Sequence, residues 1–115
     1  MACEVRTTDR FEKESKRLIK KYPSLLNELR LLGESLSLNP KQGTSLGNNL
    51  FKLQLAIKSK GSGKSGGARV ITNLIVRKNV EQDDRLYLLS IYDKSERSTI
   101  STDELKRMAT EILGG

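Results

Sequence analysis

The first helix of the chain is predicted by the spacing of its apolar residues. Phe11, Leu18 and Tyr22 fall at helical intervals, and lysines and arginines occupy most of the positions on the other side. Asp9 and Glu12 have the spacing of a capping box, which places the start of the helix near Asp9. This pattern is typical of an amphipathic helix with one face against a core.

A second helix follows directly. Pro23 breaks the first helix and suits the first turn of the next one. Leucines then recur at helical spacing over residues 25–36, and the helix is expected to end before Asn39 and Pro40. Two helices joined at a proline predict a helical hairpin.

The pattern then changes to strands. After a polar loop over 41–49, apolar and polar residues alternate over 50–57, with Lys52 and Gln54 on the face opposite the apolar residues. Further strands are expected at 2–7, 68–76 and 85–92, with turns or loops at 58–67 and 79–84. Because the last three strands are consecutive, we expect an antiparallel meander, with Arg69 on the same face as Lys52.

The chain closes with a third helix. Ser101 and Glu104 form a capping box, apolar residues follow at helical spacing, and Gly114 ends the helix. The predicted fold is therefore a single α+β domain over residues 1–115. Its order is β-α-α-β-β-β-α, with a small antiparallel sheet and with the helical hairpin and the last helix packed on one face.

The net charge of +7 is concentrated in one part of the chain. The sequence has 21 basic and 14 acidic residues, but no acidic residue lies between Ser35 and Val80. The basic residues of this segment are Lys41, Lys52, Lys58, Lys60, Lys64, Arg69, Arg77 and Lys78. An uninterrupted basic segment favours a polyanionic partner, although a basic surface also serves solubility.

Several classes of site are excluded by composition. The chain has no histidine, which removes Ser-His-Asp and Cys-His catalysis and histidine-ligated zinc. The single cysteine removes disulfide frameworks and cysteine-rich metal sites. Asp83 and Asp84 have the surroundings of solvated turn acids, so we expect no metal and no cofactor. Without a long apolar run or a signal-like start, a cytoplasmic protein without membrane contact is expected.

The glycine-rich segment 61–67 has only part of a phosphate-loop motif. A Walker A motif needs a glycine five residues before Gly63, where the chain has Lys58, and its loop leads into a helix rather than a strand. Either a flexible hairpin loop or a basic loop along a nucleic-acid backbone fits this segment. The candidate nucleic-acid-binding residues are Lys58, Lys60, Lys64, Arg77 and Lys78.

Cations on the expected open face suit RNA cleavage without histidine. When a 2′-hydroxyl attacks the adjacent phosphate, the reaction needs a base, an acid and positive charge at the phosphate. Lys52 and Lys94 are the acid and base candidates, and Arg69 is the candidate phosphate clamp because a guanidinium binds phosphate at two points. Tyr92, at the end of the last strand, completes the set.

Four segments of the chain resemble the RelE/ParE superfamily of bacterial toxins. They are KKYPSL (20–25), NP…GT…LGNN (39–49), GKSGGARVIT (63–72) and IYDKSE (91–96). The resemblance covers roughly residues 10–112 and implies the toxin of a type II toxin–antitoxin module, a mRNA interferase. RelE-like members cut mRNA in the ribosomal A site and inhibit translation; the resemblance matches Lys52 and Arg69 to two of their cleavage residues and places Lys94 near a third.

The alternative members of the superfamily are ParE-like toxins, which poison DNA gyrase without cleaving RNA. Gln54 and Ile100 stand where RelE-like members have a lysine and a catalytic tyrosine, which leans toward this alternative. A basic nucleic-acid-binding domain without activity is a third reading. In either toxin reading the resemblance implies an acidic antitoxin as partner, in addition to mRNA and the ribosome or gyrase.

Overall fold

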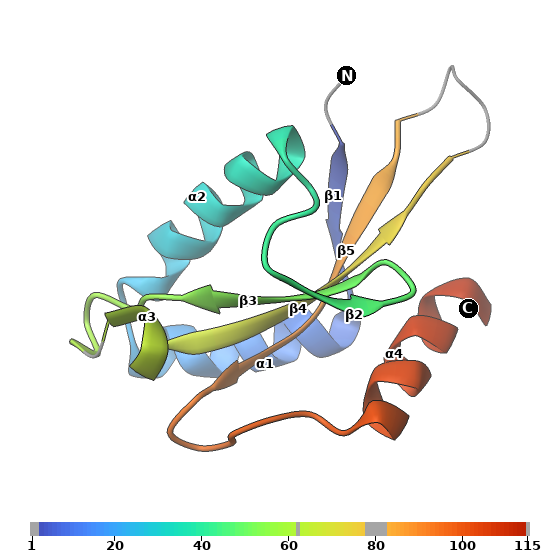
Figure 1. Cartoon of the computed structure of the whole chain (residues 1–115). Helices are drawn as coiled ribbons and strands as arrows, with labels where there is room; N and C mark the ends of the chain where they lie inside the picture. Colours follow the sequence, from blue (N-terminus) through green and yellow to red (C-terminus); the bar gives the residue numbers. More distant parts are fainter. Residues whose placement is uncertain (1–2, 62, 78–82, 115) are drawn as a thin grey trace.

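A five-stranded sheet forms the centre of the molecule (Figure 1). The structure is a computed structural model that describes residues 3–61, 63–77 and 83–114. The strands are β1 (Glu4–Thr7), β2 (Thr44–Gly47), β3 (Leu50–Leu55), β4 (Ala68–Ile75) and β5 (Arg85–Asp93). The helices are α1 (Asp9–Lys21), α2 (Leu25–Leu38), α3 (Gly63–Gly66) and α4 (Thr102–Gly114). The expected α+β class is confirmed.

The sheet order is β1-β5-β4-β3-β2, and its pairing is mixed. The predicted antiparallel meander is confirmed for β3, β4 and β5. The prediction of a wholly antiparallel sheet is wrong, because β1 pairs with β5 in parallel. The prediction of a loop over 41–49 is also wrong in part, since β2 pairs there with β3 and forms the second edge of the sheet.

The main core lies between the sheet and the helical hairpin of α1 and α2. Leu18, Leu25 and Leu36 are fully buried there against strand residues such as Val70 and Ile91. These contacts explain why the helices form, because burial of one apolar stripe stabilises a helix more than propensity does. The predicted hairpin is confirmed.

The cap of α1 differs from the predicted capping box. Thr8 is the N-cap, and its hydroxyl accepts a hydrogen bond from the Phe11 amide at 3.2 Å. The same hydroxyl donates to the Leu88 carbonyl at 3.1 Å, so one side chain begins the helix and fixes it to β5. The Glu12 side chain bonds Thr7 instead of a helix amide. At α4 half of the predicted box forms: the Glu104 amide donates to Ser101 Oγ, but the Glu104 carboxylate accepts from Arg10 and Arg97.

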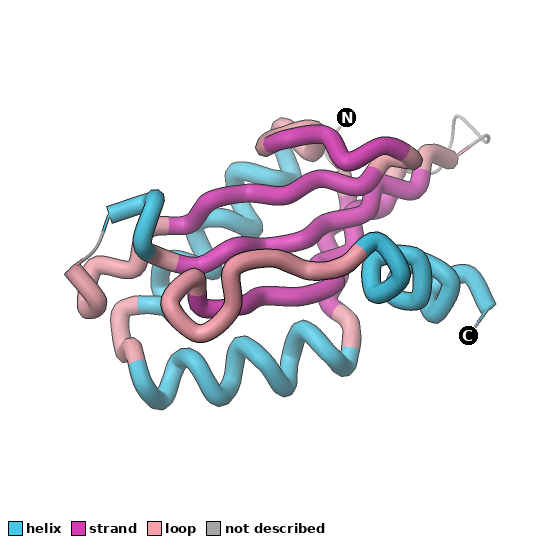
Figure 2. The backbone as a smooth tube through the Cα atoms, turned by 60° about the horizontal axis from the view of Figure 1, so that its bottom comes forward, coloured by secondary structure: helices cyan, strands magenta, loops and turns pink. Residues whose placement is uncertain are grey.

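Helix α4 covers part of the opposite face of the sheet, so the expectation that all helices share one face is wrong. A second apolar cluster forms on this side, where Met108 and Ile100 pack with Ile71 and Leu89. In Figure 2, α4 lies in front of the strands near the C-terminus, and α2 lies behind them. The face that was expected to be open is therefore only partly open, beside α4.

A β-bulge interrupts the pairing of β4 with β5. Ile71 pairs with Ser90, but the next residue, Thr72, pairs with Leu88, which leaves Leu89 without a partner in β4. Because of the bulge, Leu88 and Ile91, three residues apart, both face the α1–α2 core, while Leu89 and Tyr92 both face α4. Within the described residues, the predicted loop over 58–67 contains one helical turn, α3. No helix in the described part of the chain is long and apolar enough to cross a membrane.

Candidate functional site

Three polar side chains form a row across β3, β4 and β5, near one end of these strands. The register of the strands pairs Gln54 of β3 with Arg69 of β4, and Arg69 with Tyr92 of β5. Directly paired residues of antiparallel strands point to the same face, here the face on which α4 lies. We call Gln54, Arg69 and Tyr92 the polar row. The sequence predicted the face of Arg69, but not that it lies between Gln54 and Tyr92.

Lys52 lies beside the polar row on the same face. It is two residues before Gln54 on β3, and it pairs with Thr44 of β2 on one side and Ile71 of β4 on the other. The side chain is half-buried and makes no ion pair with an acidic residue of the described chain. Its positive charge therefore adds to the charge of Arg69 on this face.

Arg69 and Tyr92 are both almost fully buried. Arg69 is 6% exposed, and its Nη1 donates to the Ala68 carbonyl at 3.2 Å. Tyr92 is 5% exposed, and its hydroxyl has no hydrogen-bond partner among the described residues. Burial raises the pKa of Tyr92, and the nearby charges of Arg69 and Arg97 offset this effect only in part. Tyr92 is therefore a protonated hydroxyl at neutral pH, able to donate a hydrogen bond.

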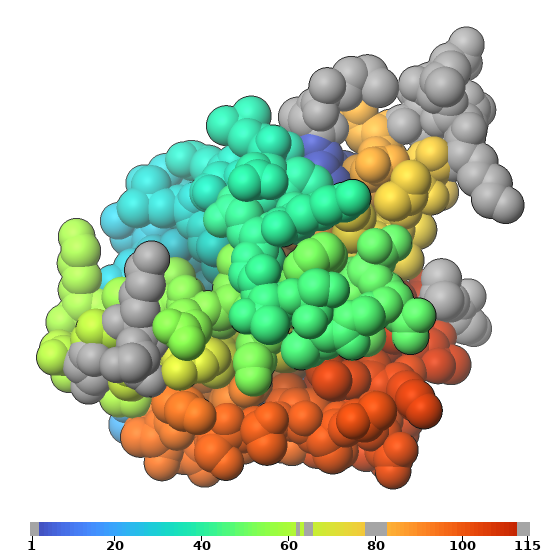
Figure 3. Space-filling model, in the orientation of Figure 1, coloured from blue at the N-terminus to red at the C-terminus, as the bar shows by residue number. Residues whose placement is uncertain are grey.

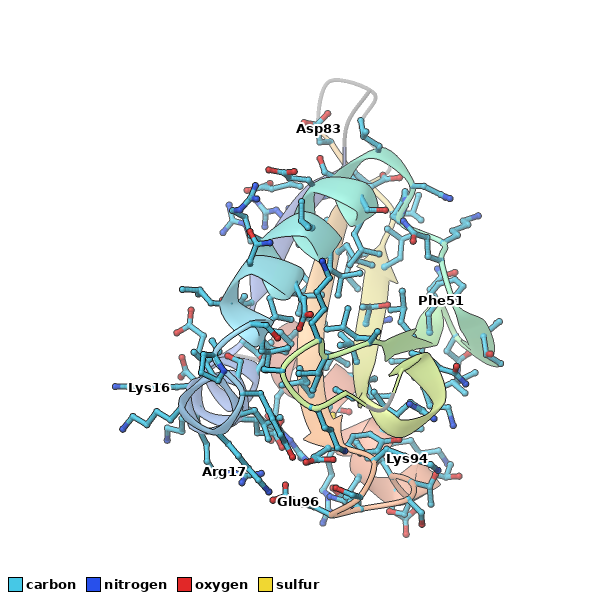
Figure 4. The ribbon with its side chains drawn as sticks, turned by 90° about the vertical axis from the view of Figure 1, so that its left-hand side faces the viewer. Lys16, Arg17, Phe51, Asp83, Lys94 and Glu96 are labelled. Carbon is cyan, nitrogen blue, oxygen red and sulfur yellow. The ribbon has the colours of Figure 1, made fainter. Side chains whose placement is uncertain are left out.

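Lys94 begins the segment that leads from β5 to α4. Its amide donates to the Gly67 carbonyl at 3.0 Å, and its Nζ donates to the Ser98 carbonyl at 3.0 Å. The segment is also anchored to α1, because Arg17 donates to Glu96 at 2.6 Å (Figure 4). Figure 3 shows this segment and α4, in orange and red, bordering the green surface of β2 and β3.

Gly67 allows the strands to approach each other at this end of the sheet. A Cβ atom on Gly67 would lie 2.1 Å from the Leu55 carbonyl oxygen, which no side chain tolerates. The absence of a side chain at Gly67 thus lets the start of β4 lie close to the end of β3, and the Gly67 carbonyl accepts a hydrogen bond from the Lys94 amide. Placement of Lys94 next to the polar row depends on this close contact.

A second polar cluster, which the sequence did not indicate, lies on the other face of the same strand end. Asp93 is fully buried and accepts from Lys60 Nζ at 2.5 Å, from the Tyr22 hydroxyl at 2.7 Å and from Ser95 Oγ at 2.7 Å. We call these four residues the Asp93 cluster. Burial alone would raise the pKa of Asp93, but the hydrogen bonds from Lys60, Ser95 and Tyr22 outweigh it and hold the pKa well below its usual range.

The Asp93 cluster gives Lys60 a structural contact, whereas the sequence placed this residue in a nucleic-acid-binding loop. The Lys60 side chain is only 11% exposed, and its Nζ also donates to Ser95 Oγ at 3.1 Å. The loop after β3 is further fixed by the Lys58 amide, which donates to a Glu28 carboxylate oxygen at 2.7 Å. The Lys60 ammonium therefore holds this loop to β5, while the exposed Lys58 side chain remains available to a ligand.

The other predicted binding residues do not all gather at this site. Lys64 belongs to α3, but its side chain is not among those the structure describes, and Lys78 lies outside the described residues. Arg77 follows the opposite end of β4 from Arg69, where its amide donates to Asp84 at 2.8 Å. Lys52, Arg69, Tyr92 and Lys94 are thus the predicted residues that the fold brings to one end of the sheet.

Two further observations limit which kinds of chemistry the site can support. In the described part of the chain, no three His, Cys, Asp or Glu side chains are grouped so that they could hold a metal ion. A hollow of about 300 Å³ lies under α4, with Thr8, Arg10 and Met108 in its lining, but it shares no residue with the polar row. No model of a known protein family matches the chain.

Proposed function

We propose that this protein is a RelE/ParE-like toxin of a type II toxin–antitoxin module and that it cleaves mRNA at the ribosome. The observation that carries the proposal is the polar row, in which the buried Tyr92 hydroxyl lies next to Arg69 with Lys52 on the same face. A buried hydroxyl without a protein partner is destabilising, and such groups occur at functional sites. A phosphate oxygen is the acceptor that would suit both Tyr92 and a cationic face.

The proposed reaction is an internal transfer within the RNA. The 2′-oxygen bonds to the adjacent phosphorus and the bond from phosphorus to the 5′-oxygen breaks, which leaves a 2′,3′-cyclic phosphate and a 5′-hydroxyl. Lys52, once it has lost its own proton, accepts the proton of the 2′-hydroxyl, and Tyr92 donates a proton to the departing 5′-oxygen. Arg69 holds the phosphate and stabilises the charge that develops on it.

Lys94 has a supporting place in this proposal. Its Nζ is bonded to the Ser98 carbonyl, so its charge lies at the edge of the site while its hydrogen-bonding capacity is partly used. We assign Lys94 to the attraction of the RNA backbone rather than to the transfer of a proton. An acidic antitoxin is the expected partner of the free toxin, because the whole chain carries a net charge of +7.

The test is to map new mRNA 5′ ends in translating cells that express the protein or its variants. Arg69→Ala is expected to lower cleavage roughly 100- to 1,000-fold, the usual cost of removing a donor that stabilises transition-state charge. Because Arg69 is buried, Arg69→Lys serves as a second variant that keeps the charge and loses the two-point contact. Arg30→Ala, on the exposed side of α2, is the matched control and should cleave like the wild type.

The non-catalytic alternative is supported by a specific observation. Ile100, at the position where the resemblance calls for a catalytic tyrosine, is 8% exposed and packs with Met108 in the α4 cluster. It offers no polar group to the site. Intact mRNA in growth-arrested cells, with double-strand DNA breaks, would overturn the cleavage proposal and favour a ParE-like action on gyrase.

A further inference from the structure

A polar groove lies next to the polar row, at the edge of the sheet formed by β2 and β3. Its volume is about 340 Å³, within the range of small-molecule sites. It is lined by Gln42, Gly43, Thr44, Lys52, Leu53 and Gln54. Two of these residues, Lys52 and Gln54, also belong to the face that carries the polar row, so the groove and the row form one continuous surface.

The wall of the groove is fixed in place. Gly43 has a φ of +93°, and a Cβ atom there would lie 2.5 Å from the Lys52 carbonyl oxygen. The Gln42 amide nitrogen donates to Ser35 Oγ at 2.9 Å and to the Asn39 carbonyl at 2.9 Å, which ties the wall to the end of α2. The groove is therefore shaped before any ligand binds, which lowers the entropic cost of binding.

The free groups of the groove suit a nucleobase. Gln54 and Thr44 are exposed, and neither side chain is used in a hydrogen bond to another described residue. An amide presents a donor and an acceptor side by side, the pair that matches N7 and N6 of adenine. The groove has no aromatic lining residue, so recognition would depend on hydrogen bonds to the base edge rather than on stacking.

The position of the groove fits a nucleotide next to the scissile phosphate. Neighbouring strands are about 4.8 Å apart, so the groove beside β3 is roughly one to two strand spacings from Arg69 on β4. Gln54 lines the groove and is paired directly with Arg69, and Lys52 lies two residues before Gln54 on the same face, where its ammonium can contact the phosphate that links the two nucleotides. If Arg69 binds one phosphate of an RNA strand, the base of the adjacent nucleotide therefore lies at the groove.

We propose that this groove binds the base of the nucleotide adjacent to the scissile phosphate and that Gln54 selects adenine there. The inference rests on the proposed function for its RNA ligand. It assigns to Gln54 a role in specificity, separate from the acid and base chemistry of Lys52 and Tyr92.

The first test measures binding without cleavage. The probes are fully 2′-O-methylated hexanucleotides of adenine, uracil or cytosine, which carry equal charge and cannot react through the 2′-oxygen. At one salt concentration, the wild type should bind the adenine hexanucleotide about tenfold more tightly than the other two. Gln54→Leu should abolish this preference and leave uracil and cytosine binding unchanged. Asn27→Leu, an amide-to-leucine change on exposed α2, should keep the preference.

Two outcomes would overturn the groove proposal: equal binding of the three probes by the wild type, or an unchanged preference in Gln54→Leu. A second readout separates this failure from failure of the proposed function. If Arg69→Ala leaves the mapped mRNA cut sites unchanged, but Gln54→Leu abolishes the adenine preference in binding, the cleavage proposal is wrong and the groove proposal stands. If Arg69→Ala abolishes cleavage, but Gln54→Leu leaves the base preference of the cut sites unchanged, the proposed function stands and the groove proposal is wrong.

Discussion

Tyr92 and Asp93 are neighbours on β5, and both side chains are almost completely buried, but they lie on opposite faces of the sheet. Asp93 faces α1, where Lys60, Tyr22 and Ser95 bond its two oxygens. Tyr92 faces the side of α4, where its hydroxyl has no partner among the described residues. The two side chains are buried to a similar extent, but Asp93 accepts several hydrogen bonds and the Tyr92 hydroxyl makes none with the described residues.

The contrast separates a polar group that holds the structure together from one that the fold leaves without a partner. Several hydrogen bonds offset the free-energy cost of removing the Asp93 carboxylate from water, and these bonds also fix the loop that carries Lys60. A buried hydroxyl without a partner lowers stability, so its retention calls for another reason. Two other described atoms are buried without partners, Thr72 Oγ1 and Arg77 Nε, but neither belongs to the polar row.

The largest effect is expected from Asp93→Ala. The change leaves the ammonium of Lys60 in a largely buried position without its carboxylate, and loss of one partner of a buried pair costs about 3–5 kcal/mol. Urea unfolding measures the free energy of unfolding directly. Asp83→Ala, at an exposed aspartate, is the control and should change it by less than about 0.5 kcal/mol. A small loss at Asp93 would show that the cluster is not structural.

A smaller effect of the same cluster should appear in acid. The pKa of Asp93 is lower in the folded protein than its ordinary value of 3.8, so the folded state binds fewer protons than the unfolded state near that pH. The stability from Asp93 is therefore complete above about pH 4 and is lost as pH falls below it. In Asp93→Asn, the free energy of unfolding should depend less on pH between 4 and 2. Equal slopes in the two proteins would contradict the assignment.

The smallest effect, with the opposite sign, is expected from Tyr92→Phe. Removal of an unpartnered buried hydroxyl should leave the free energy of unfolding unchanged or raise it by about 1 kcal/mol. The matched variant Tyr22→Phe removes a hydroxyl that donates to Asp93, and it should lower the free energy by about 1.5–3 kcal/mol. If both tyrosine variants lose stability equally, the contrast between the two faces fails. Cleavage of mRNA should fall in Tyr92→Phe alone.

Much of the fold was predictable because its elements follow simple periodicities. The helical hairpin and the strands β3, β4 and β5 have long apolar patterns that leave little choice of structure. Strand β2 was not predicted, because its four residues are all exposed and include a glycine, a composition typical of a loop. The sequence also did not show which face of the sheet α4 covers, because an amphipathic helix can pack on either face.

The candidate site was predictable only in part. Alternation along β3 correctly placed Lys52 and Gln54 on one face, because alternation has a fixed period within a regular strand. The pairing of Arg69 with Tyr92 depends on strand register, which a single sequence does not reveal. The burial of Asp93 was missed because carboxylates are mostly exposed, and its partners Lys60 and Tyr22 are 33 and 71 residues away in the chain.

The β-bulge at Leu89 has a consequence for how this site could arise or disappear. The bulge absorbs one additional residue of β5, so Leu88 and Ile91, which are three residues apart, both face the α1–α2 core, and Tyr92 faces the same side as its partner Arg69. Deletion of the Leu89 codon would restore regular alternation from Leu88 onward, with Tyr92 still beside Arg69 and Asp93 still facing α1. A one-residue insertion or deletion that no bulge absorbs would instead turn both side chains to the opposite faces of the sheet.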